Sequence, residues 1–153
     1  AGLFDTELFI AEDLDVMARV ALQGPFTFCR KELVEIYRRN ELIVNLVAQS
    51  VKRGIYRAKA FGKVYANLLS SPELTWMEKV TIARALSTSS RALGNVLVMA
   101  DRKVEARQAY KESLLQYPSV GSLIKLAATF LPGTISRVLV RKGRHILPEK
   151  DSV

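Results

Sequence analysis

Two adjacent carboxylates, Glu12 and Asp13, are the residues of this chain whose types and spacing best suit chemistry. They open an apolar segment with helical periodicity that runs to Gln23. At about 100° per residue, Asp13 falls on the apolar side of that segment, between Met17 and Val20. A carboxylate there either caps the helix N-terminus, where the helix dipole favours negative charge, or faces a cleft. In a cleft, partial desolvation can tune its pKa toward proton transfer, which makes Asp13 a candidate general base.

Asp15 and Arg19 lie on another face of the same segment, four positions apart with the acid first. This order suits an ion pair on a helix surface, where opposite charges stabilise each other weakly. We therefore expect both side chains to face solvent. We expect Asp13, rather than Asp15, to approach any cleft.

Short motifs flank the acidic pair in a fixed order. Gly2-Leu3-Phe4-Asp5 precedes it, and Gly24-Pro25-Phe26 and Tyr37-Arg38-Arg39 follow the helical segment. This order resembles inverting nucleotide-sugar glycosyltransferases of the GT-A fold, in the large family that builds bacterial polysaccharides and glycolipids. The chain departs from the family at Thr6, which interrupts an F-D-E string, and in the helix, where the family often has an aromatic residue and Leu-Trp.

The resemblance implies an enzyme. Asp13 would be the general base that deprotonates the acceptor, with Glu12 supporting it and with Asp15 and Arg38 on the acceptor side. The donor would be a nucleotide-sugar, the acceptor a glycan or a lipid-linked sugar, and a divalent cation (Mg or Mn) would hold the diphosphate. Donor and cation belong to a nucleotide-binding half that we expect to precede Ala1. This chain would then hold no cofactor or metal and would be inactive as an isolated fragment.

Asp13-Leu14-Asp15 also spells D-x-D, the string with which such transferases bind metal. In the family that string ends a strand of the nucleotide-binding half, whereas here it overlaps the acceptor-side helix. Matches of three letters arise easily by chance. We therefore assign no metal to it.

Positive charge is concentrated in two parts of the chain, whose net charge is +8 from 23 basic and 15 acidic residues. The segment 52–63 is basic and lacks acids, which suits anionic partners or simply solvent. We expect no nucleic-acid binding, because this segment lacks a recognition motif. Thr134–Leu147 combines aliphatic residues with several cations. Such a helix can lie on an anionic membrane surface or pack on the bundle with a basic rim, and the sequence favours neither.

The single cysteine, Cys29, excludes an internal disulfide and lies in an apolar run that suits a small core residue. No segment resembles a secretory signal, and no apolar run approaches the roughly 18 residues of a membrane span. We therefore expect a cytoplasmic protein. It would be peripheral on the inner face of the membrane if the basic C-terminal segment binds lipid.

The chain divides into an acceptor-side segment, 1–40, and a helical domain, 41–153. In the first, Phe26–Cys29 and Leu33–Tyr37 are short strand candidates that would form a β-hairpin. An unpaired hairpin edge would favour homo-oligomers. The predicted fold is therefore mainly α, a helical bundle with this small hairpin, within an α/β parent protein.

Helical periodicity dominates the second segment. We expect helices over 42–51, 56–69, 75–90 and 91–100. Gly54 would interrupt the first two, and Ser70-Ser71-Pro72 would end the second. Thr75 and Glu78 have the spacing of a capping box, which marks the next helix start.

Residues 93–118 resemble one tetratricopeptide repeat. Gly94 and Ala106 are small enough to let two antiparallel helices approach, Tyr110 fills the seam, and Asp101-Arg102 forms the turn. One repeat cannot bury its own core, so we expect a packing unit within a helical tail rather than a peptide groove. A groove would make the protein a helical interaction module without catalysis, the alternative to the enzyme.

Overall fold

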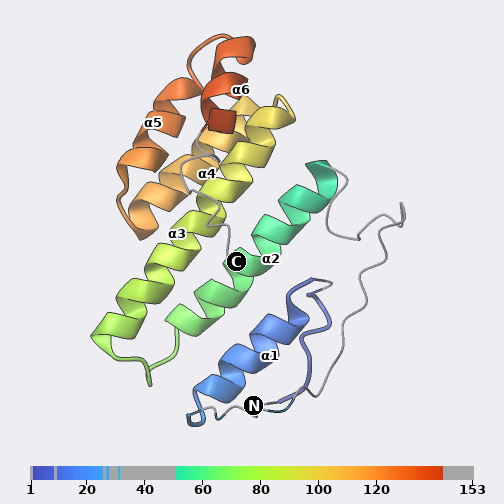
Figure 1. Ribbon diagram of the computed structural model, residues 1–153, viewed down its shortest axis with the longest axis vertical. Helices are drawn as coiled ribbons and strands as arrows, with labels where there is room; N and C mark the ends of the chain where they lie inside the picture. The colour runs from blue at the N-terminus through green and yellow to red at the C-terminus, as the bar shows by residue number, and fades with distance from the viewer. Residues whose placement is uncertain (1, 9, 26, 28–30, 32–50, 143–153) are drawn as a thin grey trace.

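The computed structural model describes residues 2–8, 10–25, 27, 31 and 51–142. Within them the chain forms helices and no strand, so the prediction of a mainly helical fold is confirmed (Figure 1). The helices are α1 (Glu12–Ala21), α2 (Val51–Leu69), α3 (Trp76–Met99), α4 (Lys103–Gln116), α5 (Val120–Ala128) and α6 (Gly133–Lys142). None of the helices in this part of the chain is both long and apolar enough to cross a membrane.

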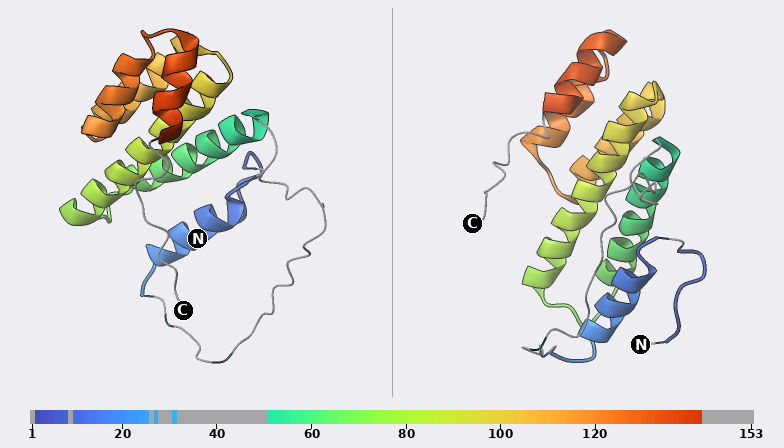
Figure 2. Two further views of the ribbon diagram at one scale, coloured as in Figure 1. Left: turned by 45° about the horizontal axis from the view of Figure 1, so that its top comes forward. Right: turned by 45° about the vertical axis from the view of Figure 1, so that its right-hand side comes forward.

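The longest helix, α3, lies at the centre of the helix packing. It contacts α2, α4 and α6, while α1 lies along α2 and α5 packs against both α4 and α6. Figure 1 shows α1, α2 and α3 side by side, and Figure 2 shows the same order from two further directions. The acidic segment and the C-terminal helices therefore occupy opposite ends of the bundle.

The predicted β-hairpin, over Phe26–Cys29 and Leu33–Tyr37, lies almost wholly outside the described residues. Thr27 and Lys31 are the described positions of this region, and neither belongs to a strand. The structure therefore gives the hairpin no support. The expected helix 42–51, apart from its last residue, and the expected site residue Arg38 also lie outside the described residues.

Gly54 does not interrupt a helix, contrary to the prediction. α2 begins at Val51 and continues through this glycine. A Cβ built at Gly54 would lie 3.1 Å from Cγ1 of Val96, so the absent side chain allows α2 and α3 to approach closely. On the inward face of α2, Val64 is fully buried.

A single helix, α3, spans the region where we predicted two. The helix continues through its central serines, which serve as packing residues. The Ser87 hydroxyl donates to the carbonyl of Ser113 on α4 at 2.7 Å, and the Ser89 hydroxyl donates to the carbonyl of Ala58 on α2 at 2.8 Å. Small hydroxyl side chains thus fill a crowded interface while their polar atoms stay hydrogen-bonded.

The N-terminus of α3 is the predicted capping box. Thr75 Oγ1 accepts a hydrogen bond from the Glu78 N–H at 3.4 Å, and Glu78 Oε2 accepts one from the Thr75 N–H at 2.8 Å. The break at Ser70-Ser71-Pro72 is also confirmed, because α2 ends at Leu69. These two local signals position the connection that turns α3 back along α2.

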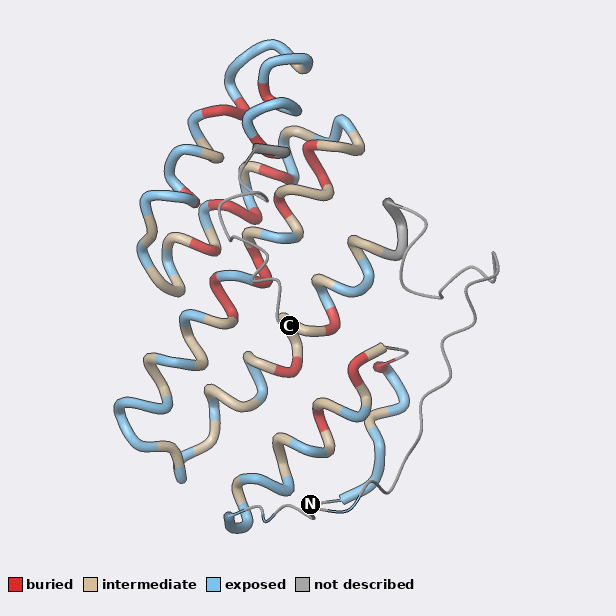
Figure 3. The backbone as a smooth tube through the Cα atoms, viewed as in Figure 1, coloured by how far each residue is buried: buried red, intermediate tan, exposed pale blue. Residues whose placement is uncertain are grey.

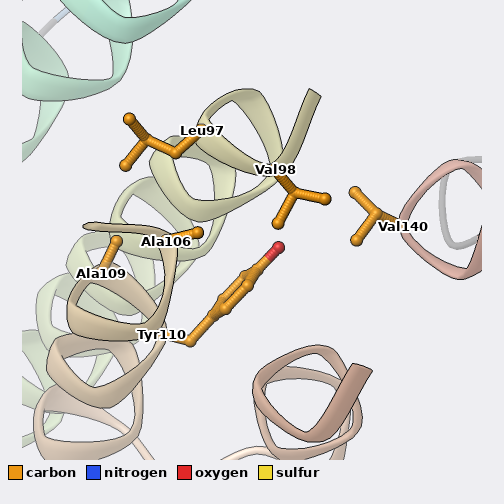
Figure 4. Packing of buried hydrophobic residues seen from close by; sticks show 6 residues of the cluster. All are labelled: Leu97, Val98, Ala106, Ala109, Tyr110 and Val140. Atoms are coloured by element: carbon orange, nitrogen blue, oxygen red, sulfur yellow. The ribbon is translucent and has the colours of Figure 1, made fainter. Parts of the chain in front are cut away.

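Small residues and one aromatic ring form the seam between α3 and α4, as the sequence predicted (Figure 4). Tyr110 is fully buried, and a Cβ built at Gly94 would lie only 2.6 Å from its ring carbon Cε1. Ala106 is also fully buried. The Tyr110 hydroxyl donates to Oδ1 of Asn95 at 3.0 Å. Asp101 makes the turn between the two helices in a left-handed conformation, with φ of 62°.

A second, smaller core joins the N-terminal segment to α2. It contains Leu8 and Ala11 before α1, and Ala60 and Val64 on α2. Figure 3 shows buried positions recurring along α2 and α3, whereas the buried residue of α1 is Asp15. This core positions the start of α1, where the acidic pair lies.

Candidate functional site

The segment Gly2–Leu8 folds back against α1 and α2. Gly2 has a φ of +77°, and a Cβ built there would lie 3.2 Å from Nη1 of Arg19, so both the conformation and the space favour glycine. Asp5 then forms a turn, in which its Oδ1 accepts from the Glu7 N–H at 2.9 Å and its carbonyl accepts from the Leu8 N–H at 3.1 Å. The G-L-F-D string is therefore a compact loop beside the acidic helix.

Two cations tie this loop to the helices. Arg19 on α1 donates to the Leu3 carbonyl at 2.8 Å. Lys63 on α2 contacts the carboxylates of Asp5 at 2.8 Å and Glu7 at 2.6 Å. The Tyr56 hydroxyl also donates to the Glu7 carbonyl at 3.3 Å. We call these contacts, made by Arg19, Tyr56 and Lys63, the loop latch.

The contacts of Lys63 in the loop latch stabilise the charged forms of Lys63 and of the Asp5 carboxylate. The hydrogen bond from Lys63 holds the pKa of the Asp5 carboxyl below its ordinary value of 3.8. The hydrogen bonds to Asp5 and Glu7 raise the pKa of Lys63 above 10.5 in turn. This role of Lys63 was not apparent from the sequence, in which the segment 52–63 suited anionic partners or simply solvent.

Asp13 is exposed at the first turn of α1. Ala11, at the N-cap, is left-handed with φ of 69° and makes no side-chain cap. The Asp13 Oδ1 instead accepts a hydrogen bond from the Leu14 N–H at 2.8 Å. The carboxylate therefore stabilises the helix start and still faces solvent, while the neighbouring Glu12 is half-buried.

The expected faces of α1 are wrong. Asp15 is the buried acid, with 5% of its surface exposed, whereas Met17 is 62% exposed. The inward face runs through Ala11, Leu14 and Asp15, because the loop 2–8 and α2 cover that side of the helix. A helical wheel places residues relative to one another, and only the folded-back loop decides which side is covered.

Asp15 and Arg19 therefore form a partly buried ion pair rather than a solvent-facing one. The Arg19 guanidinium reaches Asp15 Oδ2 with Nη2 at 2.9 Å and Nε at 3.0 Å. The same guanidinium holds the Leu3 carbonyl, so Asp15 orients the group that ties down the loop. This places Asp15 in a positioning role within the described residues.

A pocket of about 250 Å³ lies where the loop, α1 and the end of α2 meet. It is lined by Leu3, Asp5, Asp15, Arg19, Leu22, Asn67 and Leu68. The motif residues Asp5, Asp15 and Arg19 thus converge on one pocket, whereas Glu12 and Asp13 do not line it. Its lining combines polar and aliphatic groups, which would suit a small polar molecule with an apolar face.

Asp13 and Asp15, the acids of the D-x-D string, have different surroundings: the first faces solvent and the second is paired with Arg19. A divalent cation needs several oxygens that converge on one point. Among the described residues there is no group of three or more potential metal ligands of the types His, Cys, Asp and Glu. The structure therefore offers no geometry for an ion at this string.

No protein-family model, curated protein or solved structure matches this chain.

Proposed function

We propose that this chain is the acceptor-side, C-terminal part of an inverting nucleotide-sugar glycosyltransferase. The proposal rests on the different surroundings of the motif acids Asp5, Asp13 and Asp15. Asp5 and Asp15 are engaged by Lys63 and Arg19, whereas Asp13, in the first turn of the helix that Arg19 ties to the loop, is left exposed. An exposed carboxylate next to a tethered loop is what an acceptor hydroxyl would need.

Asp13 would act as the general base. Its ionised carboxylate would take the proton from an acceptor hydroxyl while that oxygen attacks the anomeric carbon of the donor sugar. The bond from that carbon to the nucleoside diphosphate would break in the same step, so the configuration would invert. A divalent cation (Mg or Mn) in the nucleotide-binding half would neutralise the leaving diphosphate. The acceptor would be a glycan or a lipid-linked sugar.

The left-handed conformation of Ala11 supports a special role for this turn. A non-glycine residue with positive φ costs about 1–2 kcal/mol, and such conformations cluster at functional sites. Ala11 immediately precedes Glu12 and Asp13, and burial in the second core holds it in place. The packing of Ala11 in the second core thus holds the start of α1 in its orientation.

The decisive test is the Asp13→Asn variant in a protein that joins this chain to its nucleotide-binding half. We expect sugar transfer to fall by about 10²- to 10⁴-fold, the usual contribution of a general base. Binding of the nucleotide-sugar, followed by calorimetry, should remain unchanged. Asp101→Asn is the matched control, since Asp101 is an exposed acid in the turn between α3 and α4 and should have no effect on transfer. Turnover near that of the unmodified protein in Asp13→Asn would refute the proposal.

The α3–α4 seam favours a second candidate function, a helical module that binds a protein partner without catalysis. Its glycine–tyrosine contact has the size complementarity expected of a tetratricopeptide-like helix pair. Such a module should bind a protein or peptide saturably, and Asp13→Asn should leave its affinity unchanged. The Asp13→Asn and Asp101→Asn pair therefore separates the two functions.

A further inference from the structure

The helix α6 buries one face against the bundle and leaves a second, aliphatic face exposed. Ser136 is fully buried and Val140 is 3% exposed, so these two positions, four apart, face the bundle. Ile135, Val138 and Leu139 are 48%, 53% and 40% exposed. A helix that merely completed a core would bury its aliphatic side chains, so the outward face of α6 needs another partner.

The preceding helix, α5, repeats this arrangement. Ser122 is fully buried, where its hydroxyl lies 2.8 Å from that of Ser113, and Ala128 is 3% exposed. The outward positions are aliphatic and exposed: Val120, Leu123 and Ile124. Phe130 and Leu131, in the turn between α5 and α6, are exposed as well. We call these exposed side chains of α5, α6 and their connecting turn the outer face of the α5–α6 pair.

Positive charge accompanies the outer face. No Asp or Glu occurs from Ser119 to Pro148, whereas the same stretch contains Arg137, Arg141, Lys142 and Arg144, besides Lys125, whose ammonium donates to Asn95 Oδ1 on α3 at 3.0 Å. The Arg137 side chain is 45% exposed, and its Nη2 lies 3.5 Å from Asp101 Oδ1 in the turn between α3 and α4. Two copies of the chain that met through this surface would bring cations against cations. A surface that is both aliphatic and cationic instead complements one with an apolar interior and anionic headgroups.

We propose that the outer face of the α5–α6 pair docks on an anionic lipid bilayer. The aliphatic side chains enter the region between headgroups and acyl chains, and the cations stay at the level of the lipid phosphates. The face of α6 that contains Ser136 and Val140 packs on the bundle, whereas the face with Ile135, Val138 and Leu139 stays exposed and is available for the bilayer. The proposal stands independently of the glycosyltransferase assignment.

Co-sedimentation with lipid vesicles tests the proposal. The chain should bind phosphatidylcholine vesicles that contain phosphatidylglycerol, and should bind pure phosphatidylcholine vesicles much more weakly. The double variant Ile135→Ser/Val138→Ser should weaken binding by about tenfold or more, because each buried methylene contributes about fourfold. Trp76→Ser/Met77→Ser is the matched control. It removes two exposed apolar residues at the far end of α3 and should leave binding unchanged.

Charge reversal supplies a second test. Arg137→Glu changes the charge by two units and should weaken binding by about 25-fold, since each unit near an anionic surface is worth about fivefold. Arg84→Glu is the control, because Arg84 is exposed on α3 and lies fourteen residues before Val98, which packs in the same core cluster as Val140 of α6. Circular dichroism should show that all variants remain folded.

Three results would overturn the proposal. The first is equal binding to the anionic and neutral vesicles. The second is binding that the outer-face variants do not weaken more than their controls. The third is a dimer in sedimentation equilibrium that Ile135→Ser/Val138→Ser dissociates while no vesicle binding occurs, which would make a second copy the partner of the outer face.

Discussion

The α3–α4 seam and the N-terminal loop are attached to their neighbours by different kinds of contact. In the seam, Gly94 and Ala106 meet the ring of Tyr110, and Ala106 and Tyr110 are fully buried. Burial also raises the pKa of the Tyr110 hydroxyl, so the ring stays neutral over the physiological range. The seam depends on shape, and shape complementarity of this kind is insensitive to pH and salt.

The N-terminal loop depends instead on charge. Lys63 is 37% exposed at its side chain and Glu7 is 81% exposed, so water competes for this part of the loop latch. Exposed ion pairs of this kind contribute little to stability. We therefore expect the loop 2–8 to open locally while the seam opens only with the whole bundle. The candidate acceptor site thus lies beside the more easily released region.

The largest effect is expected from Gly94→Ala. The new methyl group would clash with the ring of Tyr110, which cannot move aside because it is fully buried. We expect a loss of about 2 kcal/mol in the free energy of unfolding, after the roughly 1 kcal/mol that alanine gains over glycine within a helix. Urea unfolding followed by circular dichroism measures this change.

Gly62→Ala is the matched control for that variant. Gly62 also lies within a helix, but a Cβ built there would meet only the Ser89 hydroxyl, at 3.8 Å. The same substitution should therefore raise the stability by about 0.5–1 kcal/mol. If Gly94→Ala gains stability as Gly62→Ala does, the close contact between position 94 and the Tyr110 ring does not require glycine.

A smaller and more local effect is expected from Asp15→Asn. The change removes the buried charge that orients Arg19, so the hold on the Leu3 carbonyl should loosen. We expect a loss of about 1–2 kcal/mol, since the Arg19 side chain is 29% exposed and water can partly replace its partner. Amide hydrogen exchange should speed up in the loop 2–8 and stay unchanged in α3 and α4.

Asp13→Asn is the comparison for that prediction. Asp13 is exposed, and neutralising it removes only its interaction with the helix dipole, worth a few tenths of a kcal/mol. The exchange rates of the loop should stay the same. Equal losses in the free energy of unfolding for the two variants would show that the charge of Asp15 contributes no more to stability than the exposed charge of Asp13.

The sequence predicted the seam well because its signals are local. The contact between Gly94 and Tyr110 follows from the size of two side chains at repeat-like spacing, and the capping box of Thr75 with Glu78 spans one helical turn. The break before α3 is local as well. Each of these features needs only residues that are neighbours along the chain or across one helix pair.

The sequence could not predict which acid of α1 is buried. That outcome depends on the loop 2–8, whose contacts are with residues far along the chain: Lys63, more than fifty residues away, binds Asp5 and Glu7, and Leu8 packs against α2. Gly54 was misinterpreted for the same reason, since its meaning depends on Val96 of a different helix. A glycine that breaks a helix and a glycine that admits a neighbouring helix look alike until the partner is placed.

The smallest expected effect is the pH dependence of the loop latch. Lys63 lowers the pKa of Asp5 in the folded chain, so this contribution is complete above the ordinary value of 3.8 and is lost as the pH falls below it. Asp5 and Glu7 raise the pKa of Lys63, so its contribution is complete below 10.5 and is lost as the pH rises above that value. The loop should therefore be held most firmly from about pH 4 to pH 10.

Hydrogen exchange of residues 2–8, corrected for intrinsic rates, should show this window while exchange in the seam shows none. Lys63→Met keeps most of the aliphatic stem and removes the ammonium group, so it should abolish the window and increase exchange at pH 7 to the level seen at pH 3. A window that survives in Lys63→Met would assign the pH dependence to other groups. Loss of protection in the seam at the same pH as in the loop would mean that the two regions open together. The difference between a seam held by shape and a loop held by charge would then not lead to separate opening.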